Sequence, residues 1–196
     1  MKNLIFSIFL LNSIAVSAQD YSVPALSPRQ KVEQQFSISK ISVDYGRPAV
    51  KGRKIFGSLV PYNQIWRAGA NSSTKITFGQ DVSFGGQKIT AGTYGLYILP
   101  DAKNWKVILN KDAQSWGAYS YDEKLDVASV TVPVKTTPKT EYFTISFVPN
   151  SEHEVSMVMA WDTVTTSVDI KPADEAKTLK MVELLQEVKK VEREKK

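Results

Sequence analysis

"EYFTISFVP", residues 141–149, is the clearest structural signal in the chain. Phe143, Ile145 and Phe147 occupy every second position and alternate with Tyr142, Thr144 and Ser146. Successive side chains of a β-strand point to opposite faces, so this alternation predicts a strand with one buried face. The stretch is typical of an all-β domain in which each sheet covers a core on one side only.

The same alternation continues on both sides of this stretch. Further strands are expected at 35–45, 74–78, 81–89, 91–100, 105–110, 126–134, 154–161 and 163–170. A bulge near Ser39–Lys40 would reconcile a phase change in the first stretch, and Gly85–Gly86 predicts a hairpin turn. The chain is expected to turn at Pro100–Asp101 and to fold back at Trp161–Asp162. Short strands at this spacing predict an antiparallel, jelly-roll-like β-sandwich over residues 19–170.

The pattern becomes helical after Pro172. Apolar residues recur at helical spacing from Leu179 to Val191, with acidic residues early and lysines late in the segment. Such charge placement matches the helix dipole, and the segment 172–196 therefore predicts a C-terminal amphipathic helix. We favour packing of this helix against the sandwich. A dimer contact and a partly frayed tail are the alternatives.

The N-terminal segment predicts export. Lys2 precedes an apolar run from Leu4 to Val16, and small residues follow at a potential cleavage point, so residues 1–18 are expected to be a secretory signal peptide. The protein would then be periplasmic or secreted, with no transmembrane segment after cleavage. The chain contains no cysteine, so its stability must come from an apolar core and not from disulfides.

One long segment between predicted strands is strongly basic. Residues 46–73 read "GRPAVKGRKIFGSLVPYNQIWRAGANSS" and contain no acidic residue. In one interpretation its apolar residues form a lid over one end of the sandwich. In the other, its cations face a groove and bind an anion, because guanidinium groups match carboxylate, phosphate and sulfate geometry. The candidate cations are Arg47, Lys51, Arg53, Lys54 and Arg67.

A second candidate is aromatic. Trp116, Tyr119 and Tyr121 crowd a glycine-bearing stretch between two predicted strands. Exposed aromatic rings could stack on sugar rings, or they could simply close the edge of the sandwich. Trp66 and Asn71 of the basic segment complete the set of candidate ligand-binding residues, whereas Trp105 and Trp161 are expected in the core.

Several kinds of site find no support in the sequence. His153 is the only histidine and cysteine is absent, so we expect neither a metal site built on several histidines nor a thiol nucleophile. No phosphate-binding loop motif occurs, and we expect no cofactor. Nucleic acid is not expected as a partner, because the net charge of +5 is modest and export removes the protein from it. The oligomeric state is left open.

The quoted basic segment also carries a resemblance. "SPRQKV", "VDYGRPAVKGRKIFGSLVPYNQIWRAGAN", "TKITF", "AGTYGLYILP" and "WKVILN" resemble a family of exported bacterial proteins, domain of unknown function 2911, from about Ser27 to Ile170. The resemblance implies a secreted β-rich domain and brings no established activity or ligand. One position departs from the family pattern: glycine is expected where Asn63 stands, and asparagine still tolerates a left-handed backbone.

These features favour an exported binding module for an anionic or carbohydrate ligand. A hydrolase acting on cell-envelope or environmental polymer is the first alternative, although catalytic residues cannot be named. A structural envelope protein that assembles through its C-terminal helix is the second. An enzyme would bring two carboxyl groups together in a cleft with a raised pKa in one of them. A binding module predicts that the side chains of Arg53 and Arg67 converge on an open groove, and burial of both against backbone carbonyls would contradict the anion site.

Overall fold

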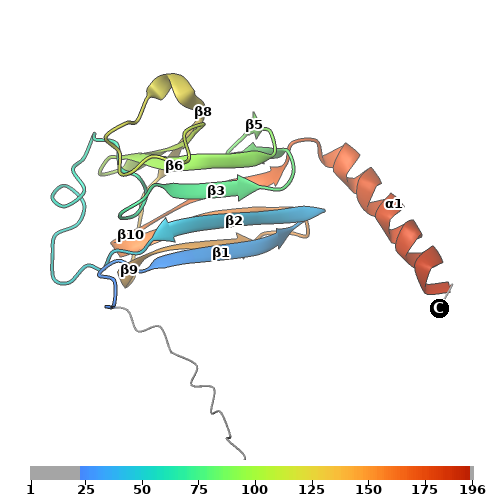
Figure 1. The fold of residues 1–196 in the computed structure, drawn as a ribbon, viewed down its shortest axis with the longest axis horizontal. Helices are drawn as coiled ribbons and strands as arrows, with labels where there is room; N and C mark the ends of the chain where they lie inside the picture. The colour runs from blue at the N-terminus through green and yellow to red at the C-terminus, as the bar shows by residue number, and fades with distance from the viewer. Residues whose placement is uncertain (1–22, 195–196) are drawn as a thin grey trace, which may run out of the picture.

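The computed structural model describes residues 23–194, so the predicted signal peptide lies outside the described residues. Two antiparallel sheets face each other, and a single helix leaves them at one end (Figure 1). The elements are β1 (Arg29–Phe36), β2 (Ser39–Gly46), β3 (Thr74–Phe78), β4 (Val82–Phe84), β5 (Gln87–Ile89), β6 (Gly92–Pro100), β7 (Asn104–Asn110), a 3₁₀ turn (Glu123–Leu125), β8 (Asp126–Pro133), β9 (Lys135–Pro149), β10 (Val155–Pro172) and α1 (Glu175–Glu194).

The larger sheet has the order β1-β2-β3-β6-β7-β8 and the smaller one β5-β4-β10-β9. Every strand pair is antiparallel. The predicted all-β antiparallel sandwich with a C-terminal helix is therefore confirmed. The predicted turn at Gly85–Gly86 is also confirmed: both residues have positive φ angles and join β4 to β5.

Two local predictions were wrong. The phase change near Ser39 is not a bulge within one strand, because the chain reverses at Ser37 and forms the β1–β2 hairpin. Conversely, the chain does not fold back at Trp161–Asp162. β10 continues through that point, and its register against β9 shifts on either side of Asp162, whose φ is 54°. A bulge and a tight turn both break period-two alternation, so the sequence pattern alone does not separate them.

The core lies between the sheets and is rich in aromatic rings. Trp105, Phe143 and Trp161 are buried there, as predicted for the two tryptophans. Phe56 and Trp66 from the basic segment join them: the Trp66 ring stacks on Trp161 with centroids 5.8 Å apart, and Phe56 lies 4.9 Å from Trp105. The basic segment thus closes one end of the sandwich with its own apolar side chains.

Contrary to our expectation, the helix α1 does not pack against the sandwich. It extends away from the end opposite the basic segment (Figure 1), and Thr178 is its one buried residue. Asp174 caps its first turn by accepting a hydrogen bond from the Lys177 N–H at 2.9 Å. The chain enters α1 directly from β10, and only the first two turns of the helix, as far as Met181, lie near the sheets.

Candidate functional site

The basic segment, residues 47–73 between β2 and β3, is held by both sheets. Trp66 exchanges two backbone hydrogen bonds with Ile98 of β6, each 2.8 Å long. At its other end, the Val50 N–H donates to the Glu141 carbonyl of β9 at 2.7 Å. Asn63 adopts a left-handed backbone with φ of 58°, the geometry that glycine would also provide. The segment is therefore a fixed lid, and its cations have defined positions.

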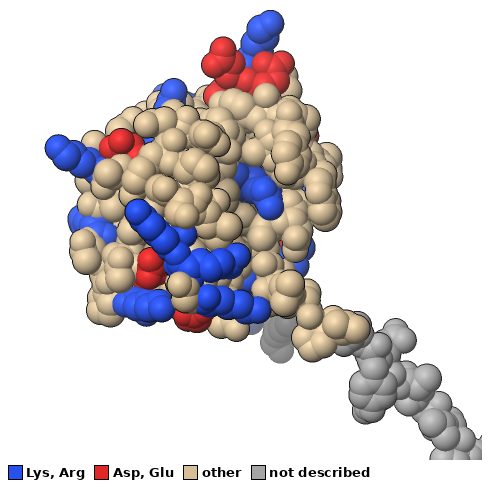
Figure 2. All heavy atoms as spheres, turned by 90° about the vertical axis from the view of Figure 1, so that its left-hand side faces the viewer, with Lys and Arg blue, Asp and Glu red and all other residues tan. Residues whose placement is uncertain are grey.

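Lys and Arg side chains gather over this end of the sandwich, with few acidic side chains among them (Figure 2). Arg47 is already engaged: it donates to the Phe143 carbonyl at 3.2 Å and to Thr144 Oγ1 at 3.0 Å. Its guanidinium lies 5.7 Å from the centroid of the Tyr142 ring. Arg47 and Lys51 line a hollow of about 330 Å³ together with residues near the N-terminal end of the described chain.

Arg53 serves the lid itself. Its Nη2 donates to the Ala49 carbonyl at 2.6 Å and its Nε to the Val50 carbonyl at 3.1 Å. These bonds stabilise the turn that carries Lys51 and Gly52, and they occupy donors that a ligand would need. Lys54 is exposed to solvent next to it. Of the five predicted cations, Arg53 is the one whose role is most plainly structural.

Arg67 has a different environment. Trp66 pairs with Ile98 of β6, and both side chains point into the core. Because successive side chains of an extended chain alternate in direction, Arg67 points to the outer face of the larger sheet, as Tyr97 does. Its Nε is buried and has no hydrogen-bond partner among residues 23–194. The ion pairs found in the described part of the chain do not include it. Burial lowers the pKa of Arg67, an effect that the nearby Tyr119 phenol opposes.

The loop 111–122 covers this outer face beside Arg67. Ser73 is its anchor, since its hydroxyl donates to the Ser115 carbonyl at 2.6 Å and lies 3.2 Å from the Gly117 carbonyl. Gly95 of β6 lets the loop approach closely, because a side chain there would collide with the Asp112 carbonyl oxygen. Asp112 in turn fixes the loop through hydrogen bonds from the Gln114 N–H and the Ser115 hydroxyl.

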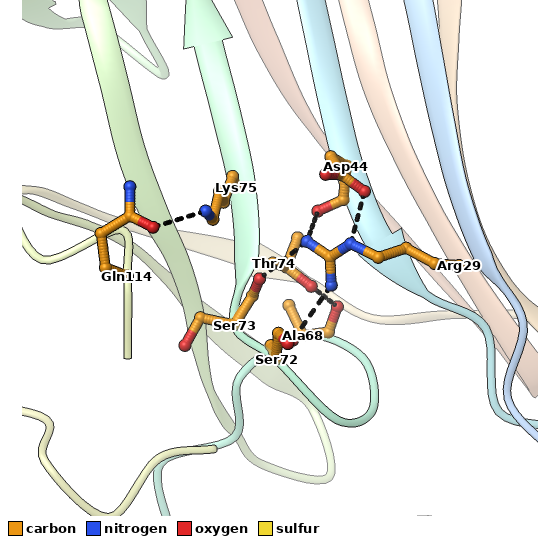
Figure 3. A network of polar contacts seen from close by, with 8 residues as sticks. All are labelled: Arg29, Asp44, Ala68, Ser72, Ser73, Thr74, Lys75 and Gln114. Atoms are coloured by element: carbon orange, nitrogen blue, oxygen red, sulfur yellow. Dashed lines mark hydrogen bonds and ion pairs between the residues drawn. The ribbon is translucent and has the colours of Figure 1, made fainter. Parts of the chain in front are cut away.

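A network of hydrogen bonds and one ion pair at the start of β3 holds Ser73 in place (Figure 3). Arg29 forms an ion pair with Asp44 at 2.7 Å and donates to the carbonyl of Ser73 at 3.2 Å. Thr74 Oγ1 donates to the Ala68 carbonyl at 2.7 Å, which fixes the backbone that follows Arg67. Lys75 donates to Gln114 of the loop at 2.8 Å. Arg29 and Lys75 thus have polar partners, whereas the Nε of Arg67 has none among the described residues.

Two aromatic rings of the loop remain exposed. Trp116 is 67% and Tyr119 93% exposed, and the Trp116 backbone pairs with Ser72. Asn71 precedes Ser72, is exposed and has a φ of 64°. We use the name "Arg67 site" for Arg67, Asn71, Trp116 and Tyr119. Sequence reasoning had placed these residues in two separate candidates, which the structure brings together.

Two predicted site residues lie elsewhere. Trp66 is buried in the core, and its indole N–H donates to the Gly69 carbonyl at 3.0 Å. Tyr121 packs on Tyr97 with ring centroids 5.1 Å apart and donates to Asp126 at 2.6 Å. Burial, followed by the hydrogen bond to Asp126, raises the pKa of Tyr121. We correct the assignment of Trp66, because a ring buried in the core cannot stack on a ligand. Tyr121 is half-buried, and its contacts with Tyr97 and Asp126 give it a structural role.

The carboxyl groups of the described residues that show a pKa shift are all shifted downwards, opposite to the shift of a general acid. Hydrogen bonds lower the pKa of Glu33, Asp101 and Asp112, donated chiefly by Lys40, by the Lys103 backbone and by Ser115 respectively. Within residues 23–194, no group of three acidic, His or Cys side chains is placed to hold a metal ion. The described part of the chain also has no helix that is long and apolar enough to cross a membrane.

Comparison with known proteins identifies the domain. The family described as "Protein of unknown function (DUF2911)" matches residues 27–170. The chain belongs to this family. The match covers both sheets, the lid and the loop 111–122, and ends just before α1, so the Arg67 site lies inside the DUF2911 domain. No curated protein and no solved structure gives a match.

Sequence reasoning missed the residues that position the site. Ser73, Gly95 and Arg29 have unremarkable local patterns, and their roles depend on contacts across the sheets. Only the glycine carried a usable signal, because glycine within a predicted strand often marks a place where another backbone approaches closely.

Proposed function

We propose that this DUF2911 protein is a binding module for an anionic carbohydrate, recognised at the Arg67 site. The observation that carries the proposal is the buried Nε of Arg67, which has no partner among the described residues and lies near the exposed Tyr119. Buried polar groups are almost always hydrogen-bonded, and unpaired charged groups with a shifted pKa concentrate at functional sites. A ligand carboxylate or sulfate would provide the missing acceptor.

The neighbouring residues favour a sugar as the carrier of that anion. Trp116 and Tyr119 are largely exposed to solvent, and aromatic rings pack well on the apolar faces of sugar rings. Asn71 has an exposed amide that can both donate to and accept from hydroxyl groups. A uronic acid or a sulfated sugar combines the two kinds of group that the site can contact. Export, as expected from residues 1–18, is part of the proposal.

The hydrolase alternative has less support. Cleavage of a glycosidic bond usually requires two carboxyl groups, one with a raised pKa. The acidic groups of the described residues that show a pKa shift are shifted downwards by hydrogen bonds. The Arg67 site itself contains no carboxyl group. We therefore propose binding without catalysis.

The proposal is tested by calorimetric titration with uronic-acid oligosaccharides, their neutral parent sugars and inorganic sulfate. We expect uronic-acid oligosaccharides to bind more tightly than either of the other probes. Arg67→Met should weaken this binding by about 10- to 100-fold, the loss of one hydrogen-bonded ion contact. Arg67→Lys should recover only part of it, because lysine lacks the planar fork.

Two further variants serve as controls. Lys54→Met removes an exposed charge of the same lid and should leave the affinity unchanged, whereas Trp116→Ala should weaken binding of oligosaccharides but not of sulfate. Equal losses in Arg67→Met and Lys54→Met would show general charge attraction and contradict the proposal. So would a complete lack of binding to all acidic sugars tested.

A further inference from the structure

The helix α1 leaves an apolar stripe uncovered. Each residue of the stripe is between 40% and 55% exposed, and the stripe consists of Leu179, Met181, Leu184, Leu185, Val188 and Val191. The helix leads away from the sandwich (Figure 1), so the sheets do not cover this face. Contiguous exposed apolar surface of this kind commonly marks a contact with another molecule.

The spacing of the stripe fits another helix. Met181, Leu184, Val188 and Val191 follow the alternating three- and four-residue intervals by which two helices interlock. α1 has 20 residues, a length of about 30 Å. It is the one α-helix among residues 23–194. A second α1 therefore matches the stripe in length and in spacing.

We propose that two copies of the chain associate through α1, with the two helices antiparallel. Charges beside the stripe favour this direction. In a parallel pair, Glu187 of each copy would lie beside Glu192 of the other, which places like charges together twice. In an antiparallel pair, Lys180 of each copy comes close to Glu194 of the other. The one unfavourable contact in the antiparallel pair is the repulsion between the two copies of Glu187. The helix dipoles also favour the antiparallel pair.

The cavity beside α1 also favours the antiparallel pair. A cavity of about 640 Å³ lies between the sandwich and the first turns of α1, and Ile38, Ile89 and Met181 line it. In an antiparallel pair, the C-terminal end of the second helix would lie beside Met181, at the mouth of this cavity. Val191 of the second copy would then gain apolar neighbours on the sandwich. The two sandwiches would lie at opposite ends of the helix pair and would not collide.

Cysteine cross-linking tests the direction cleanly, because the chain has no cysteine of its own. We expect a mixture of Met181→Cys and Val191→Cys proteins to form a disulfide-linked dimer on mild oxidation, at least 10-fold faster than either variant alone. Cross-linking of each variant alone, without a gain in the mixture, would show a parallel pair and overturn the proposal.

Light scattering tests the association itself. The unmodified protein should have the mass of two chains, and Leu184→Asp should reduce it to one. Gln186→Asp places the same charge on the opposite side of the helix and should leave the mass at two chains. Circular dichroism checks that both variants retain their fold. A single-chain mass for the unmodified protein at the highest concentration measured would overturn the proposal. The Arg67 site lies at the other end of the sandwich, so the two proposals fail independently.

Discussion

Replacing Arg67 with methionine should make the protein more stable. Methionine keeps most of the aliphatic length of the arginine side chain and removes the guanidinium. The Nε that it removes is buried and has no partner among the described residues, so it costs free energy in the folded state. A gain in stability on removal of a charged residue is unusual, and it would indicate that Arg67 is retained for binding.

The expected gain follows from the exposure of the group. An unsatisfied buried donor costs about 1–3 kcal/mol, and here only one atom of a half-buried side chain is affected, which gives about 1 kcal/mol. In a domain of this size, about 1 kcal/mol raises the melting temperature by about 2–4 °C. Added uronic-acid oligosaccharide should stabilise the unmodified protein and have a much smaller effect on the variant at the same concentration.

Thermal unfolding followed by circular dichroism measures this change. Arg53→Met is the matched control, since it makes the same substitution in the same lid. It removes hydrogen bonds to the Ala49 and Val50 carbonyls and should lower the stability by about 1–2 kcal/mol. The reasoning fails if Arg67→Met lowers the melting temperature as Arg53→Met does, because Arg67 would then have stabilising contacts.

The remaining predictions concern the loop 111–122. Gly95→Ala should destabilise the protein by about 1–3 kcal/mol and weaken sugar binding, because the new methyl group displaces the Asp112 backbone; chemical unfolding and titration check this. Tyr121→Phe should cost about 1 kcal/mol in urea unfolding through the lost hydrogen bond to Asp126, and an unchanged stability would contradict it. Hydrogen bonds from Ser115 lower the pKa of Asp112 below its ordinary value of 3.8, so this carboxylate stabilises the loop above that pH. The stabilisation should be lost as the pH falls through the lower folded-state pKa. Tryptophan fluorescence should report this loss through Trp116 of the loop, and Asp112→Asn should remove the pH dependence of the signal.

Much of the fold could be predicted because its signals are local. Alternation in residues 141–149, the Gly85–Gly86 turn and the break after Pro172 each arise from neighbours in sequence, and the structure confirms the elements they predict. The two wrong predictions, at Ser39 and at Trp161–Asp162, arose because a turn and a bulge interrupt the alternation in the same way. The hairpin at Ser37 and the bulge at Asp162 both interrupt the alternation, and only pairing across strands separates them.

The site could be predicted only in part. The sequence indicated that the segment 46–73 was unusual and that Trp116 and Tyr119 were candidate ligand contacts. It could not show that the two regions meet at Ser73, since this depends on a hydrogen bond between residues more than 40 positions apart. Nor could it show that α1 stands free of the sandwich, because an apolar stripe has the same spacing whatever covers it.

The sequence by itself determined that the chain forms an antiparallel sandwich and that a basic segment without acidic residues lies between two of its strands, since periodicity and charge are properties of neighbouring residues. The tertiary structure alone decided what each cation does. Arg53 and Arg67 are the same residue type in the same segment. Arg53 donates to two carbonyl groups, whereas the buried Nε of Arg67 has no partner within residues 23–194. The difference lies in which backbone groups the folded chain brings within reach of each guanidinium.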